Sequence, residues 1–418
     1  MGDRGAANVP RRRARRNLLL LVAGNGVSTF GNAVYLVAIV LFLKEEYGSA
    51  LLLGAFQFLA LIPGFLLAPV SGALIDRLSR RGVIIGTDLF RGAVMIIVGV
   101  LVLRPEWRSP PIILGMALAA GAGHAFFVPA AQALIPEIVP VGELSRATAF
   151  RAGSSQLFNM VGNAVGGVLY VALGAPMVLL LNGVTFLLSA VQESWIDVPG
   201  ASPVEAGRSL RGDVLEALVF LRRRGDLRRP ILSQVGMFLL SPVFLLSLPF
   251  LLIDRLGAGE SVLGYLFALG LAGGIIAFLV LGRVHPDRLI SRRFGTGAYV
   301  AFGVILLGMS VHQSVVALAI AALIAGGAAG TVYLTATVTL QRRSPSRMHG
   351  RLFAVMEAGS AAAAPVAYLV TGYLLDLLGP TRGEVVYLVT GLAAIGWAGY
   401  LAFRAPGEGR EEPKRSAR

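Results

Sequence analysis

The sequence predicts an all-α integral membrane protein with twelve transmembrane helices in two six-helix bundles. Three observations predict it: long continuous apolar runs, alternating basic segments between those runs, and a charged loop pattern found in both halves. The chain has 418 residues, of which 56% are hydrophobic and only 14% are charged. Soluble proteins average about a quarter charged residues, so this chain has too few polar groups to cover a water-facing surface.

Twelve apolar segments are long enough to cross a bilayer as helices, which takes about 20 residues each. The first six lie at residues 17–43, 49–75, 82–103, 111–135, 147–171 and 174–193. The other six lie at residues 230–253, 261–281, 294–311, 313–338, 352–375 and 384–403. The basic run before the first segment is interpreted as its flank rather than as a signal peptide, because the apolar run continues to Leu43.

Basic residues alternate between the two sides that these spans define. Starting with the N-terminus inside, the inner segments carry 31 Lys and Arg residues and the outer connections carry 5, while Arg91 lies within a span. Cytoplasmic loops are enriched in Lys and Arg, so both termini are expected in the cytoplasm. The lipid bilayer is thus the first partner. Arginine outnumbers lysine by 35 to 2, which favours a GC-rich bacterial genome. The absence of cysteine fits a protein of the bacterial plasma (inner) membrane, which is where we expect the chain.

A polar stretch at residues 194–229 separates the two sets of six spans. The predicted division is therefore an N-terminal bundle (1–193), a cytoplasmic linker (194–229), a C-terminal bundle (230–404) and a cytoplasmic tail (405–418). Within the linker, apolar residues at helical spacing are flanked by arginines. That pattern predicts an amphipathic helix on the membrane surface, with its arginines near anionic headgroups.

The loop after the second span is echoed after the eighth. The first carries Gly72, Asp76, Arg77, Arg80 and Arg81. The second carries the same residue types in the same order, at Gly282, Asp287, Arg288, Arg292 and Arg293. A glycine here lets helices approach closely, an aspartate caps or pairs at a helix end, and the arginines hold the loop near lipid phosphates. Such parallel repeats are expected where two bundles rock about a central site.

The pattern Gly72-x3-Asp76-Arg77-x2-Arg80-Arg81 resembles the signature loop of the major facilitator superfamily, with Ser79 where that family usually has glycine. Residues 127–140, 216–222 and 350–355 resemble the branch that contains the enterobactin exporter and macrolide efflux proteins. The resemblance implies a twelve-helix alternating-access transporter with both loops acting as conformational gates. It also implies export of amphiphilic small molecules, of drug or siderophore type, coupled to proton influx.

Ionisable groups inside lipid are costly, so each is a candidate for carrying the coupled proton. The candidates are Glu357, Asp88 and His124. An Asp88–Arg91 pair at i and i+3 that neutralises both charges is the alternative for Asp88, and hydrogen-bonded packing is the alternative for His124. The sequence departs from the antiporter signature at Asn163, which replaces a proline.

Uncharged polar residues recur within the spans and are candidates for lining a substrate cavity. They are Asn25, Asn32, Gln57, Gln156, Asn159, Asn163, Asn182 and Gln234. Gln156, Asn159 and Asn163 share one helix face by their spacing. Their alternative role is interhelical hydrogen bonding, and the neighbouring Gly162 and Gly166 are expected to serve close helix packing.

Other function classes find no support in the sequence. There is no phosphate-binding loop of the G-x4-G-K-[ST] type, no G-x-S-x-G elbow, no cysteine and no pair of histidines at metal-ligand spacing. We therefore expect a monomeric transporter of small molecules with no enzymatic activity, cofactor, metal site or nucleic-acid partner. Two alternatives stay open: an importer or facilitator of a small polar solute, and a membrane-embedded enzyme.

Overall fold

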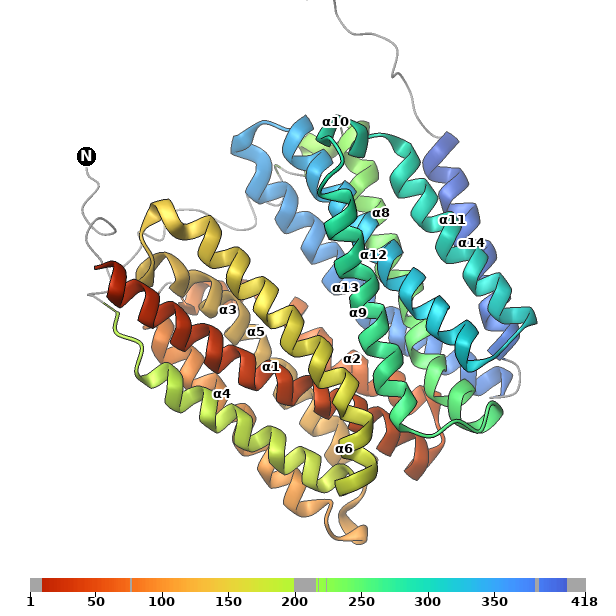
Figure 1. Ribbon diagram of the computed structural model, residues 1–418, viewed down its shortest axis with the longest axis horizontal. Helices are drawn as coiled ribbons and strands as arrows, with labels where there is room; N and C mark the ends of the chain where they lie inside the picture. Colours follow the sequence, from red (N-terminus) through yellow and green to blue (C-terminus); the bar gives the residue numbers. More distant parts are fainter. Residues whose placement is uncertain are drawn as a thin grey trace, which may run out of the picture.

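A computed structural model describes residues 10–75, 77–198, 216, 218–222, 224–379 and 383–403. Within these ranges the secondary structure is helical, and the helices form two bundles (Figure 1). The first bundle contains α1 (Arg11–Tyr47), α2 (Ala50–Leu66), α3 (Ala68–Ile75), α4 (Arg80–Leu101), α5 (Pro110–Ile138) and α6 (Leu144–Ser194). The second contains α8 (Gly225–Phe250), α9 (Ser261–Leu281), α10 (Pro286–Leu289), α11 (Arg292–Val311), α12 (Val315–Arg343), α13 (Ser346–Leu378) and α14 (Gly383–Phe403).

Ten helices in the described ranges are long and apolar enough to cross a membrane. One of them contains two spans, because Gly174 in α6 has φ 73° and ψ 164° and reverses the chain there. Glycine adopts a positive φ without the steric cost that other residues incur. One more span consists of α2 and α3, which follow each other directly through Leu67. The described chain therefore contains the twelve predicted spans, and the predicted break between residues 171 and 174 is confirmed.

Helix ends follow local sequence signals. Ser49, Ser79 and Ser314 each accept a hydrogen bond from a backbone amide in the first turn of α2, α4 and α12. This is the usual way in which serine stabilises a helix N-terminus. Gly48 ends α1 in the left-handed conformation. A short π-helix, η3 (Leu251–Arg255), follows α8 and extends its span.

Because the spans alternate in direction, Pro10, Val198, Arg224 and Phe403 all lie at one end of the molecule, here called the linker end. The opposite end, which includes Tyr47 and Gly174, is called the far end. In Figure 1 the two bundles lie close together at the lower, far end and diverge toward the linker end. The predicted amphipathic helix and tail lie largely outside the described residues and stay predictions, although residues 218–222 are helical.

Close packing within the first bundle depends on small residues. A Cβ atom on Gly162 would lie 2.7 Å from the Phe30 carbonyl oxygen of α1, and one on Gly166 would lie 2.9 Å from the Val37 Cβ. Helices in lipid gain no hydrophobic free energy when they associate. Close approach of their backbones through small residues is therefore one of the main sources of stable helix packing. The packing role predicted for Gly162 and Gly166 is confirmed.

Candidate functional site

Four glycines bring the two bundles together near the far end. Gly54 of α2 packs on the backbone of Tyr368 in α13, and Gly372 packs on the backbone of Ala50. On the other flank, a Cβ on Gly167 of α6 would lie 2.7 Å from the Ser261 Cα of α9. Gly264 of α9 packs in turn on the Asn163 carbonyl oxygen. The bundles thus meet backbone to backbone along α2–α13 and α6–α9.

Polar contacts also join the bundles at the far end. The Asp376 carboxylate of α13 accepts hydrogen bonds from the Ser49 hydroxyl at 2.6 Å, the Ala50 amide at 2.7 Å and the Leu51 amide at 3.0 Å. The first turn of α2 in one bundle is therefore capped by a carboxylate from the other. Lys44 of α1 makes a second polar contact between the bundles, an ion pair with Asp254.

Toward the linker end, the faces of α2, α6, α9 and α13 that contain these glycines separate. We call them the inter-bundle faces. Glu357 lies eleven residues before Tyr368, about three helical turns, and therefore shares the inter-bundle face of α13. Its side chain is exposed and forms no ion pair within the described chain. Tyr333 of α12 lies near it and is 40% exposed.

The predicted polar stripe of α6 divides between two environments. Asn163 is buried at the α9 interface, where its amide nitrogen donates to the carbonyl oxygen of Asn159 at 2.8 Å and to the Asn159 side chain at 2.6 Å. Its side-chain amide therefore bonds within α6, whereas the alternative to cavity lining was hydrogen bonding between helices. Gln156 and Asn159 are half-buried, and Gln156, eleven residues before Gly167, shares the inter-bundle face.

The remaining polar candidates lie mostly inside the bundles. Gln57 is half-buried on α2 and lies near Tyr368 across the α2–α13 contact. Asn25, Asn182 and Gln234 are buried, and the Asn182 side-chain oxygen lies 3.2 Å from the Thr185 hydroxyl, within hydrogen-bond reach. Asn32 is half-buried, and His124 of α5 is exposed.

The loop at residues 72–81, which the resemblance predicts to be a gate and which we call the first gate loop, is anchored within its own bundle. Arg80 pairs with Glu137 of α5 at 2.7 Å and donates to the Ala133 carbonyl oxygen at 3.0 Å. Arg81 donates to the Ser194 carbonyl oxygen at the end of α6. Arg77 is exposed, and Asp76 lies outside the described residues. A Cβ on Gly72 would meet nothing within 4 Å, so the close packing expected of Gly72 does not occur in this arrangement, in which the linker ends are apart.

The loop at residues 282–293, called the second gate loop on the same basis, is more exposed than the first. Asp287 lies 3.4 Å from His285, and Arg288 and Arg293 are exposed. Gly282 follows the last turn of α9, and Arg292 begins α11, although the placement of its side chain is not described. The two loops thus share residue types, but among the described side chains anchoring contacts to other helices are found for the first loop only.

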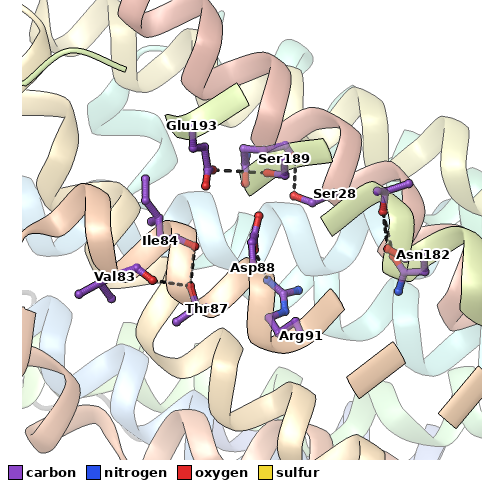
Figure 2. Close-up of polar contacts among 11 residues, drawn as sticks. Ser28, Val83, Ile84, Thr87, Asp88, Arg91, Asn182, Ser189 and Glu193 are labelled. Carbon is purple, nitrogen blue, oxygen red and sulfur yellow. Dashed lines mark hydrogen bonds and ion pairs between the residues drawn. The ribbon is translucent and has the colours of Figure 1, made fainter. Parts of the chain in front are cut away.

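A buried charge cluster lies within the first bundle, between α4 and the second half of α6 (Figure 2). The predicted Asp88–Arg91 pair is confirmed, with Oδ1 of Asp88 3.4 Å from the guanidinium. The Arg91 guanidinium stacks 4.0 Å from the centre of the Phe186 ring. Glu193 joins the pair with an exposed fraction of 0%. It was missed in the sequence because it is the last residue of an apolar segment, where a carboxylate is typical of a span boundary.

Comparisons with known proteins agree with this architecture. The family model described as Major Facilitator Superfamily matches residues 21–347. The multidrug efflux pump Tap of Mycolicibacterium fortuitum is 24% identical over 376 residues, which cover 87% of this chain and 90% of that protein. Macrolide efflux protein A of Streptococcus pyogenes is 26% identical over 180 residues, 42% of this chain and 44% of that protein. The crystal structure of the nucleoside transporter NupG matches with a TM-score of 0.71 at 12% identity and covers 93% of this chain and 100% of that chain, which shows the shared fold.

Proposed function

The chain belongs to the major facilitator superfamily, and on that basis we propose that it exports amphiphilic small molecules of drug or siderophore type, coupled to proton influx. Membrane transport itself follows from the family. Export is supported by relatives whose names are macrolide efflux protein and multidrug efflux pump, each at low identity. We further propose that the protein works as a monomer, since one chain supplies both bundles.

The main support for the proposal is that the two bundles contact each other near one end of the molecule. Glycine packing and the Asp376 cap hold them together near the far end, while the inter-bundle faces separate toward the linker end. The alternation of basic residues favours the linker end as the cytoplasmic one. Under that assignment, the conformation is the one that would load cargo from the cytoplasm of a bacterial plasma membrane. The units that rock are residues 1–193 and 230–404, joined by the linker 194–229 and followed by the tail 405–418.

We propose that Glu357 contacts the cargo and also binds the coupled proton. Its carboxyl group is exposed on a face that opens toward the linker end, at a depth within span eleven where charged groups are costly and often functional. Gln156 on the facing bundle and Tyr333 beside Glu357 add polar and aromatic surface for an amphiphilic ligand. The two loops at 72–81 and 282–293 are proposed gates that re-form contacts when the linker end closes.

Flux through the purified protein in liposomes tests the proposal. With ethidium and erythromycin as probes, we expect saturable movement toward the compartment corresponding to the outside, and accumulation only when that compartment is the more acidic one. Equilibration of the probes without dependence on the pH gradient would favour a facilitator. Conversion of either probe into a new product would indicate an enzyme.

A further inference from the structure

Two carboxyl groups and one guanidinium share an enclosed position in the first bundle, away from the inter-bundle faces. Asp88 and Glu193 have exposed fractions of 0% and Arg91 of 5%. The Ser189 hydroxyl donates to Oε1 of Glu193 at 3.5 Å. Asp88 lies near enough to Glu193 for the two carboxyl groups to interact electrostatically, so the two acids are close neighbours. Figure 2 shows Glu193 and Ser189 side by side on α6, with the side chain of Asp88 below them and next to Arg91.

The charges of this cluster do not balance. With all three groups ionised, one negative charge would be buried without a counter-ion. A buried charge that lacks a partner is strongly unfavourable, whereas a neutral carboxylic acid is tolerated when hydrogen-bonded. Two further oxygens, Oδ2 of Asp88 and Oε2 of Glu193, have no hydrogen-bond partner among the described residues. A single proton shared between these oxygens would remove the excess charge and give both a partner.

We propose that Asp88 and Glu193 bind one exchangeable proton between them, with Glu193 as its main carrier. Asp88 is the ionised member because its Oδ1 faces the Arg91 guanidinium. On binding, a carboxylate oxygen of Glu193 takes a proton from a hydronium ion, which leaves as water, and the resulting carboxylic acid donates to Asp88. On release, the proton returns to water and the cluster carries a net charge of −1.

Among the described residues, the helices next to the cluster contribute one other titratable group. α1 faces the cluster with Gly24, whose added Cβ would lie 3.3 Å from the Ser189 hydroxyl. α5 faces it with Gly123, against which the Arg91 stem packs, and with His124, which interacts electrostatically with Arg91. His124 is exposed on its other side, so it is a separate group that a test must distinguish.

The cluster lies directly beside the anchor of the first gate loop. Ser194, the residue after Glu193, accepts the hydrogen bond from Arg81, and Trp195 accepts one from Arg16 of α1 at 3.0 Å. A change of charge at Glu193 therefore acts on the end of α6 that these two arginines hold. That this change is used to drive cargo movement rests on the proposed function, but the proton itself is bound with or without cargo.

Infrared titration of the protein in liposomes, without cargo, tests the site. We expect a C=O stretch of a protonated carboxylic acid, shifted in D₂O, that persists at neutral pH in the wild type. Glu193→Gln should remove it because the cluster then balances. Asp88→Asn should also remove it, because Arg91 then pairs with an ionised Glu193. The band should survive in Glu357→Gln, His124→Ala and Glu143→Gln, the last an exposed acid directly before the first turn of α6.

Absence of the band from the wild type overturns the proposal whatever the variants do. Its survival in either Glu193→Gln or Asp88→Asn also overturns it, provided that the variant is monodisperse and melts cooperatively. A band that behaves as expected, together with ethidium movement that ignores the pH gradient, would keep the proton site and reject proton-coupled export. The two claims therefore fail separately.

Discussion

Oδ1 of Asp376 lies 2.7 Å from the backbone nitrogen of Ala50, although 326 residues separate the two in sequence. A helix N-terminus leaves its first amide groups without intrahelical acceptors, and a carboxylate there also interacts favourably with the helix dipole. Because Asp376 belongs to the second bundle, this cap exists only while the far ends of the bundles are together. It is therefore an interaction that the far end must break in order to open.

Replacing this cap should shift the balance between conformations. Loss of a helix cap costs about 1 kcal/mol, which is roughly a fivefold change in an equilibrium. We expect Asp376→Ala to increase the population with a separated far end by about that factor. Spin labels on single introduced cysteines measure it directly, since the chain has no cysteine of its own.

Glu384→Gln is the matched control for Asp376→Ala. Glu384 pairs with Arg255 at the same end of the molecule but within one bundle. The Glu384→Gln variant should leave the distances between the spin labels unchanged. An equal shift in both variants would mean that loss of a carboxylate, rather than loss of the cross-bundle cap, changes the equilibrium.

Gly167 should tolerate no side chain while the far end is closed. The added Cβ of Gly167→Ala would lie 2.7 Å from the Ser261 Cα, and overpacking of this kind costs about 1–3 kcal/mol. We expect spin labels to report a smaller population with a closed far end, and we expect a lower melting temperature in detergent. Gly153→Ala, at an open position of the same helix, should be neutral or slightly stabilising. Equal behaviour of the two alanine variants would contradict the backbone contact between α6 and α9.

The Arg80–Glu137 pair should stabilise the first gate loop. The two side chains are 15% and 18% exposed, so the burial of this ion pair is intermediate between that of a surface pair and that of a fully buried pair. Glu137→Gln leaves Arg80 without its counter-ion, and we expect the free energy of unfolding to fall by about 1–3 kcal/mol. Tryptophan fluorescence during thermal unfolding measures the change. Arg77→Ala, which removes an exposed arginine of the same loop, should change stability by less than about 0.5 kcal/mol.

Glu357 and His124 should differ in their effect on proton coupling. Glu357→Gln removes the carboxyl group exposed on the inter-bundle face of α13, so we expect ethidium movement that no longer responds to the pH gradient. His124→Ala should retain the response. Both are measured in the liposome assay described above. If both variants retain gradient-driven accumulation, neither residue carries the essential proton.

The sequence predicted most of the fold because the signals concerned are local. Apolar runs and the charge alternation located twelve spans, and the spacing of Asp88 and Arg91 was enough to predict their pairing. Glycine spacing likewise predicted the close packing of Gly162 and Gly166. Each of these predictions depends only on the spacing of residues within one segment, or on how apolar residues behave in lipid.

What the sequence could not predict depends on contacts between distant helices. Glu193 looks like a boundary residue until α6 packs against α4 and encloses it beside Asp88. Asn163 and Gln156 share a face by spacing, yet one is buried against α9 and the other is not, because the bundles separate along that face. The Asp376 cap has no local signature, since its acceptor and donors lie in different halves of the chain.

The central claim is that the two bundles alternate between closure at the far end and closure at the linker end. Distances between spin labels test it most directly. One pair, Glu106→Cys with His312→Cys, reports on the far end, and Gly142→Cys with Arg283→Cys reports on the linker end; all four positions are exposed. On acidification with ethidium present, we predict that the first distance lengthens while the second shortens. Distances that stay fixed, or that change in the same direction, would contradict the account.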